Sequence, residues 1–167
     1  PAHMPDTTQF DLADSWIFDR LNHTVSEVTR LFDEYKFGEA GRELYNFIWN
    51  DFCDWYIEIS KVALNGNDEE LKARKQENLI WILDQILRLM HPIMPFVTEK
   101  LWLSMPHEGK SIMTAKYPET HAEFENKQAD NDMAFLIEVI KAVRNIRMEV
   151  NAPMSSQIDI MIQLDDE

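Results

Sequence analysis

The sequence is poor in cysteine and glycine, and it has no long apolar run. One cysteine, Cys53, excludes an internal disulfide and a paired-cysteine zinc site, and it is typical of the reducing cytoplasm. Four glycines favour helices over a turn-rich β architecture. No apolar stretch approaches the roughly 20 residues that span a bilayer, so no membrane partner is expected. The five histidines lack the i, i+4 spacing of a helical metal site, and we expect no metal.

Positive charge is also scarce, because 16 Lys and Arg residues oppose 30 Asp and Glu residues, giving a net charge of −14. Phosphate contacts favour clustered cations, so this balance argues against a protein that coats nucleic acid. It leaves room for recognition of one folded RNA at a small basic patch. No glycine-rich phosphate loop occurs, and we expect no cofactor within this chain.

Nothing in the sequence predicts catalysis. Cys53 lies inside a predicted helix, away from the helix N-terminus that would lower the pKa of its thiol, so we interpret it as a packing residue. Asp51 and Asp54 are more typical of a charged helix surface than of an acid/base pair. His91, before Pro92, is interpreted as a packing or helix-ending residue. A hydrolase that uses Asp51 or Asp54 is the least favoured alternative.

Apolar residues recur every three or four positions through most of the chain, which is typical of amphipathic helices. The pattern predicts helices over residues 11–35, 38–64, 68–90, 96–105 and 129–150, with a polar connector from 106 to 125. Alternation over residues 158–164 predicts a strand. We therefore predict an all-α fold, an antiparallel bundle of four to five helices with a truncated C-terminal strand.

The same pattern predicts how the chain is divided. Residues 1–4 are interpreted as a cloning remnant and residues 5–126 as the helical bundle. Residues 127–153 would form the final helix and a junction, and residues 154–167 the start of a truncated small α/β domain.

The predicted helix 38–64 has two adjacent apolar stripes, which suggests packing on two sides. The first consists of Leu44, Ile48, Phe52, Trp55, Ile59 and Val62, and the second of Tyr45, Trp49, Cys53 and Tyr56. Polar residues occupy the opposite face. We therefore interpret the aromatic stretch 49–61 as the seam of a bundle.

Three groups of residues are candidates for contact with RNA. Lys72, Arg74 and Lys75 open the third predicted helix, and Lys141, Arg144 and Arg147 share one side of the fifth. For both groups a solvated charged face is the alternative interpretation. In the first helix, Trp16 and Arg20 lie one turn apart and could combine stacking with charge, although Trp16 also fits the core.

Five segments, in order, resemble the anticodon-binding domain of bacterial valyl-tRNA synthetases, which are class I aminoacyl-tRNA synthetases. They are LADSWIFDRLN (12–22), WNDFCDWYIEISK (49–61), LRLMHPIMPFVTEKLW (87–102), PHEGKSIMTAKYP (106–118) and VRNIRMEVNAP (143–153). The HPIMPF motif is shared by the synthetases for valine, isoleucine and leucine. FCDWY followed by IEISK, SIM before YP, and VRNIR indicate the valine member. Ser15 and Lys110 differ from the residues that are usual at these positions of the family motifs.

The resemblance implies a bundle that holds the anticodon stem and loop of valine tRNA. Valine activation with ATP, transfer and editing would occur in other domains, whose HIGH-type and KMSKS-type motifs are absent here. It implies tRNA-contact regions at the starts of the first and third helices, where the candidates are Arg20, Lys72, Arg74, Lys75 and Asn78, together with Trp16 from the residue pattern. Arg144 and Arg147 lie in the matched VRNIR motif, where they either contact RNA or pack the domain junction.

The partners expected from the resemblance are valine tRNA and the remaining domains of the same synthetase, with this fragment monomeric and cytoplasmic. The main alternative is a helical protein-interaction bundle without a nucleic-acid role. A positive surface joining the first and third helices would favour RNA, and a bare apolar groove would favour a protein.

Overall fold

The computed structural model describes residues 4–151, 153, 159 and 161 and is helical with no strand in these residues. The longer helices are α1 (Leu12–Asp33), α2 (Phe37–Asn46), α3 (Glu58–Leu64), α4 (Glu69–Met90), α5 (Pro95–Trp102) and α6 (Lys127–Glu149). Short 3₁₀ helices are η1 (Thr7–Gln9), η3 (Ile112–Thr114) and η4 (Ala122–Phe124), and η2 (Phe47–Ile57) is a π-helix. The all-α prediction is confirmed. The strand predicted at 158–164 lies outside the described residues except for 159 and 161, and stays a prediction.

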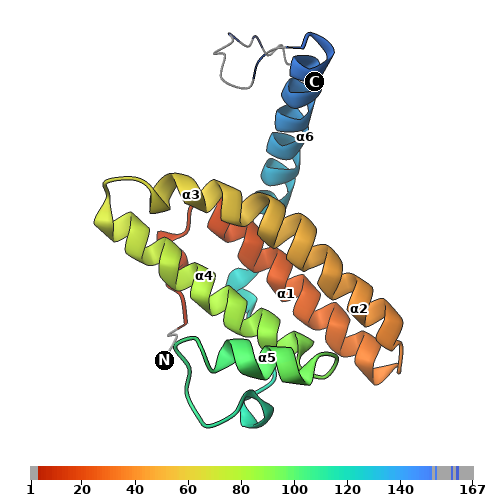
Figure 1. Cartoon of the computed structure of the whole chain (residues 1–167). Helices are drawn as coiled ribbons and strands as arrows, with labels where there is room; N and C mark the ends of the chain where they lie inside the picture. Colours follow the sequence, from red (N-terminus) through yellow and green to blue (C-terminus); the bar gives the residue numbers. More distant parts are fainter. Residues whose placement is uncertain (1–3, 152, 154–158, 160, 162–167) are drawn as a thin grey trace. The chain divides into compact units, whose positions relative to one another are not determined.

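The chain forms two compact units, Pro1–Met133 and Ala134–Glu167. In the first unit, α2, η2 and α3 run back alongside α1, and α4 again follows the direction of α1 (Figure 1). The second unit contains the part of α6 from Ala134 onward. The break between α4 and α5 follows from His91 and Pro92, which end α4, and from Pro95, which opens α5.

Local sequence signals set the helix starts. At α1, the Asp11 side chain accepts from the Asp14 backbone N–H (2.8 Å) and the Asp14 side chain accepts from the Asp11 backbone N–H (3.2 Å). This reciprocal capping satisfies two backbone donors that the helix itself leaves unpaired. At α4, Asp68 is the N-cap and accepts from the Leu71 N–H at 3.0 Å.

The helical segment from Phe37 to Leu64 is uninterrupted, but its middle is π-helical. Its buried positions are Ala40, Leu44, Phe47, Phe52, Tyr56 and Ser60, with a step of five between Phe47 and Phe52. In a regular α-helix, the residues on the same face as Phe47 would include 51, 55 and 62. The wider π-helical turn instead moves the buried face by one residue, to Phe52 and Tyr56. Tyr56 is therefore fully buried, whereas Val62 is 79% exposed.

The second apolar stripe predicted for this segment is wrong in part. Tyr45 is 59% exposed and Trp49 is 52% exposed, because both lie opposite Ala40, Leu44 and Phe47, the face that packs into the bundle. Of the predicted polar face, Asn46, Asn50, Asp54, Glu58 and Lys61 are exposed, whereas Glu43 is half-buried.

The core of the first unit lies between α1, η2 and α4. Phe18 of α1 stacks on Phe10 at 4.5 Å between ring centroids and contacts Trp81 (5.4 Å) and Phe124 (4.9 Å). The connector 106–125 was expected to be polar, yet its Ile112 and Phe124 are buried. Its two short 3₁₀ turns bring these side chains back onto the bundle.

Candidate nucleic-acid interface

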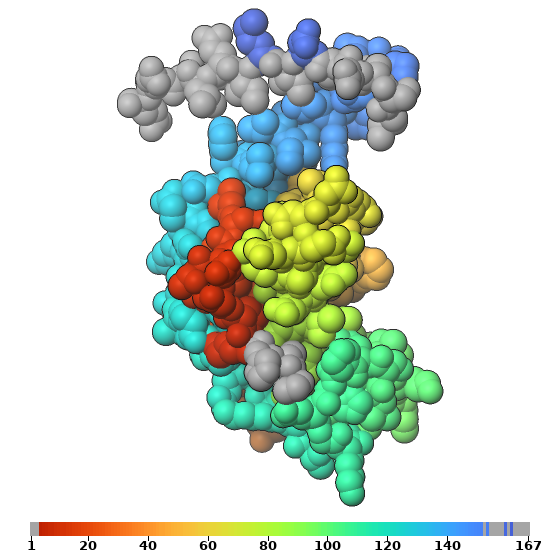
Figure 2. All heavy atoms as spheres, turned by 90° about the vertical axis from the view of Figure 1, so that its left-hand side faces the viewer, coloured from red at the N-terminus to blue at the C-terminus, as the bar shows by residue number. Residues whose placement is uncertain are grey.

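The starts of α1 and α4 lie side by side, which brings two of the predicted contact regions together. Arg74 Nη1 donates to Gln9 Oε1 at 2.6 Å, and Lys75 Nζ donates to Asp11 Oδ2 at 2.7 Å. Figure 2 shows the N-terminal segment, in red, next to the yellow-green first half of α4. This face is the candidate interface.

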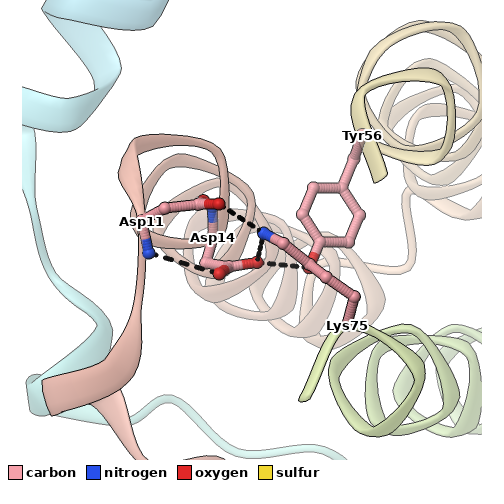
Figure 3. Close-up of polar contacts among 4 residues, drawn as sticks. All are labelled: Asp11, Asp14, Tyr56 and Lys75. Atoms are coloured by element: carbon pink, nitrogen blue, oxygen red, sulfur yellow. Dashed lines mark hydrogen bonds and ion pairs between the residues drawn. The ribbon is translucent and has the colours of Figure 1, made fainter. Parts of the chain in front are cut away.

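An ionic cluster of Asp11, Asp14, Tyr56 and Lys75, here called the Lys75 cluster, joins these elements (Figure 3), and all of its members except the half-exposed Asp11 are buried. Lys75 Nζ lies 2.6 Å from Asp14 Oδ1, which also accepts from the Tyr56 hydroxyl at 2.6 Å. The ammonium also lies 5.6 Å from the centre of the Tyr56 ring. Both Lys75 and Asp14 are almost fully buried, at 2% and 3% exposure, so the pair must be retained to avoid an uncompensated buried charge.

The pKa directions in the Lys75 cluster match this geometry. Burial opposes ionisation of Asp11, but the hydrogen bond and charge of Lys75 outweigh it and lower the pKa of Asp11. Burial, followed by the charge of Asp14, raises the pKa of Tyr56. The Tyr56 hydroxyl therefore stays protonated and remains a hydrogen-bond donor to Asp14.

Three predicted contact residues face the interior instead of the surface. Trp16 is 4% exposed and Asn78 is 6% exposed, and Asn78 hydrogen-bonds Tyr56. Lys75 is held by the two aspartates. The core alternative for Trp16 describes its position, and contact of these three buried side chains with RNA stays a prediction. All three lie on helix faces that pack into the bundle.

Arg20 is a linking residue between α1 and η2. Its Nε donates to Asp51 Oδ2 at 3.0 Å, with side-chain exposures of 32% and 18%. Burial raises the pKa of Asp51 even though Arg20 acts in the opposite direction. For Arg20, burial is outweighed by Asp51, and the pKa of its guanidinium is raised. Asp51 therefore has a structural partner, and it does not form a pair with Asp54.

The remaining predicted residues present more of their side chains. On α4, the Lys72 side chain is 33% exposed, with Nζ 3.7 Å from Glu69, and Arg74 is half-buried. In the second unit, Arg144 is exposed, and Arg147 is half-buried and donates to the Pro153 carbonyl at 2.6 Å.

Sequence reasoning missed the residues that hold this face in place, namely Gln9, Asp11, Asp14 and Tyr56. The Asp11-x-x-Asp14 spacing directly before an apolar helix was an available signal for the helix cap. No local pattern, however, pairs Asp14 with residues 42 and 61 positions further along the chain.

Other kinds of site find no support in the described residues. They contain no group of three or more His, Cys, Asp or Glu side chains placed to hold a metal ion. In this part of the chain, no helix combines the length and the apolar character that crossing a membrane requires. Burial, with a contribution from Asp54, raises the pKa of Cys53, so its thiol is not an activated nucleophile.

The helical architecture and the comparisons with known proteins together define the class of protein to which this chain belongs. Residues 14–162 match the family described as the anticodon-binding domain of tRNA ligase, and the chain belongs to that family. It is 91% identical to the valine–tRNA ligase of Lactobacillus johnsonii over all 167 residues and 89% identical to that of Lactobacillus acidophilus over 166. The Latilactobacillus sakei protein of the same name is 58% identical over 166 residues. The resemblance found in the sequence is thereby confirmed. The chain spans 19% of the length of each of these relatives. The alignment with the Lactobacillus johnsonii protein includes residues 1–4, which we interpret from the sequence as a cloning remnant.

Proposed function

We propose that this chain is the tRNA-recognition module of a valine–tRNA ligase, the ATP-dependent enzyme that joins valine to its tRNA. The observation that carries the proposal is the family match over residues 14–162, together with 91% identity to a valine–tRNA ligase. Amino-acid activation and transfer belong to other parts of the enzyme, where ATP binds. The chain would act in the cytoplasm, as a monomer when isolated.

Recognition is proposed to occur at the face formed by the starts of α1 and α4. Lys72 and Arg74 are assigned direct contact with RNA, because both are only partly buried at this face, whereas Lys75 is enclosed with its two aspartates. The Lys75 cluster holds the two helix starts in register, with Trp16 and Asn78 supporting it from the core. Arg20, Arg144 and Arg147 are proposed as further contacts.

The charge of −14 limits the interaction to a small surface. Only a few phosphates can be neutralised, so the affinity of this chain alone would be modest and would fall as salt displaces it. Specificity would come from unstacked anticodon-loop bases, which side chains can contact at their edges and faces.

The test is binding of this chain to a valine tRNA transcript and to the same transcript with a swapped anticodon, at two salt concentrations. We expect preference for the valine anticodon, and loss of affinity in Lys72→Ala and in Arg74→Ala. Arg42→Ala is the matched control, since Arg42 is an exposed arginine on α2. Equal binding of both transcripts would contradict anticodon recognition by this chain.

One observation favours a second candidate function, contact with another protein surface. A hollow of about 450 Å³ between η2 and α4 is lined by Phe52, Cys53, Ile57, Leu79, Leu83 and other apolar side chains, with no polar surface. Such a surface suits apolar side chains from the remaining domains of the synthetase better than it suits RNA. Leu79→Lys would weaken association with those domains while leaving binding to the tRNA transcript unchanged.

A further inference from the structure

Helix α5, which follows the end of α4 (Figure 1), has an outer face that is apolar and exposed. Phe96 is 91% exposed, and Val97 and Leu101 are about half exposed. These three residues share one side of the helix, because they lie at positions i, i+1 and i+5. The turn before α5 adds two further apolar side chains that are nearly half exposed. The surface, here called the α5 face, consists of Ile93, Met94, Phe96, Val97 and Leu101.

The polar residues of α5 lie on its inner side, which is the reverse of the usual pattern of a surface helix. Thr98 is fully buried. Glu99 is half-buried and accepts from the Ile112 backbone N–H at 3.1 Å. Trp102 is also buried, and its Nε1 donates to Asp84 of α4 at 2.7 Å. Because these contacts fix the rotation of α5 about its own axis, the α5 face stays outward.

A helix that is packed on one side and apolar on the other is normally covered on both sides. Single exposed apolar side chains need no explanation, but a contiguous group of them marks an interaction surface. Of the two charged residues of α5, only Lys100 lies outward. One cation is too few to hold a nucleic-acid backbone or an anionic membrane surface. The α5 face therefore suits an apolar protein surface that places a carboxylate opposite Lys100.

We propose that the α5 face packs against a part of the same synthetase polypeptide that lies outside these 167 residues. This inference rests on the proposed function, which assigns the chain to a longer enzyme. The chain spans 19% of the length of its relatives, so most of the polypeptide is available to cover this face. The contact is separate from the hollow between η2 and α4, because the two surfaces share no residue.

The size of the α5 face favours a cover from the same polypeptide over a second copy of the chain. Stable association of separate proteins buries roughly 800 Å² on each partner, which is more than five partly exposed side chains provide. A surface on the same polypeptide is held nearby at a high effective concentration, so a smaller patch is sufficient.

The first experiment tests whether the α5 face is covered in the longer enzyme. Hydroxyl-radical oxidation of side chains is compared between this chain and the full-length enzyme that contains it. If Phe96 is buried there as in an interface core, its oxidation should be roughly tenfold slower than in this chain. Met113, which is 80% exposed on η3 and lies outside the α5 face, is the internal reference. Equal oxidation of Phe96 in both proteins would overturn the proposal.

The same measurement on this chain alone tests the alternative covers. It is made at a low and a high protein concentration, and then with valine tRNA added. We expect the oxidation of Phe96 to be the same in all three samples. Slower oxidation at the high concentration would show that a second copy covers the α5 face, and slower oxidation with tRNA would show that RNA does. Either result would overturn the proposal.

The second experiment uses variants in both proteins. Phe96→Ser should leave the thermal unfolding midpoint of this chain unchanged, because the side chain is exposed in it, and should increase the oxidation of Met94 several-fold in the full-length enzyme. Phe96→Leu keeps an apolar side chain and should preserve the protection of Met94. Val62→Ser, a matched loss of an exposed apolar side chain on α3, should change neither quantity. Full protection of Met94 in Phe96→Ser would overturn the assignment of Phe96 to the contact.

The two proposals fail in distinguishable ways. If Phe96 is oxidised equally in both proteins while this chain prefers the valine anticodon, the α5 face is not covered within the enzyme and the proposed function stands. If Phe96 is protected in the full-length enzyme while this chain binds neither transcript, the α5 face is a contact surface and tRNA recognition by this chain fails.

Discussion

Helices α4 and α6 are nearly the same length, 22 and 23 residues, and have similar sequence patterns, yet their surroundings differ. Eight residues of α4 are buried, whereas α6 buries only Ala129 and Met133, both near its start. Further along α6, Phe135 is 53% exposed and Met148 is 68% exposed. A helical period therefore shows which face is apolar, but not whether this chain covers that face.

The same contrast holds for the cations on the two helices. Lys75 of α4 is buried between Asp11 and Asp14, whereas Lys141 of α6 is exposed. Both were grouped with neighbouring basic residues on the sequence evidence alone. What separates them is long-range pairing, because the partners of Lys75 lie more than 60 positions away.

The largest expected effect comes from removing the buried cation. Lys75→Met leaves Asp14 buried without its counter-charge, and breaking such a pair costs about 3–5 kcal/mol of unfolding free energy. Lys141→Met, the matched change on α6, should alter stability by less than about 0.5 kcal/mol. Urea unfolding of both variants measures this. A loss below about 1 kcal/mol for Lys75→Met would contradict the structural role assigned to the Lys75 cluster.

A matched pair of isoleucines tests the apolar side of the comparison. Ile82 of α4 is fully buried and Ile146 of α6 is 57% exposed. Ile82→Ala should lower the unfolding free energy by about 2–5 kcal/mol, through lost burial and a residual cavity. Ile146→Ala should cost less than about 1 kcal/mol. Comparable losses, again from urea unfolding, would show that α6 is covered in solution.

The fold was largely predictable because helix period and helix ends are local properties. Asp68, Pro92 and Pro95 fix the ends of α4 and the start of α5 without reference to distant residues. The π-helical turn at Phe47–Ile57 was not predictable, since a step of five depends on which neighbours the side chains meet. Val62, which was expected in a packed apolar stripe, is consequently 79% exposed, whereas Tyr56 is buried as expected.

The candidate site was predictable as a region but not as individual contacts. Lys72, Arg74 and Lys75 are three cations within four residues, and the sequence does not distinguish them. The fold gives them three different environments: partly exposed, facing a cavity, and buried in an ion pair. A charge that is buried by long-range pairing has no local signature.

Smaller effects are expected at the helix starts, where α4 and α6 should behave alike. Asp68 caps α4 through the Leu71 N–H, and Asn126 precedes α6 and accepts from the Ala129 N–H at 3.0 Å. Asp68→Ala and Asn126→Ala should each cost about 1 kcal/mol, typical of a lost N-cap. Thermal unfolding followed by circular dichroism measures both. A much larger loss at only one start would show that local capping, and not only packing, distinguishes the two helices.

The smallest expected effect concerns the pKa values of Asp11 and Asp51, on which residues of α4 and α6 act in opposite directions. Lys75 of α4 lowers the pKa of Asp11 against the effect of burial. Burial raises the pKa of Asp51, and Asp130 in the first turn of α6 adds to the increase while Arg20 opposes it. A ¹³C-carboxyl NMR titration should therefore find Asp11 titrating below, and Asp51 above, the ordinary aspartate pKa of about 3.9.

The consequences for stability have opposite signs. The contribution of Asp11 is present above its unfolded pKa and is lost as pH falls through the lower folded value. The contribution of Asp51 is present below its unfolded pKa and is lost as pH rises through the higher folded value. Asp130→Asn should lower the pKa of Asp51 and leave that of Asp11 unchanged, and Lys75→Met should raise the pKa of Asp11 alone. If either substitution moved both signals together, the two carboxylates would not report separately on α4 and α6.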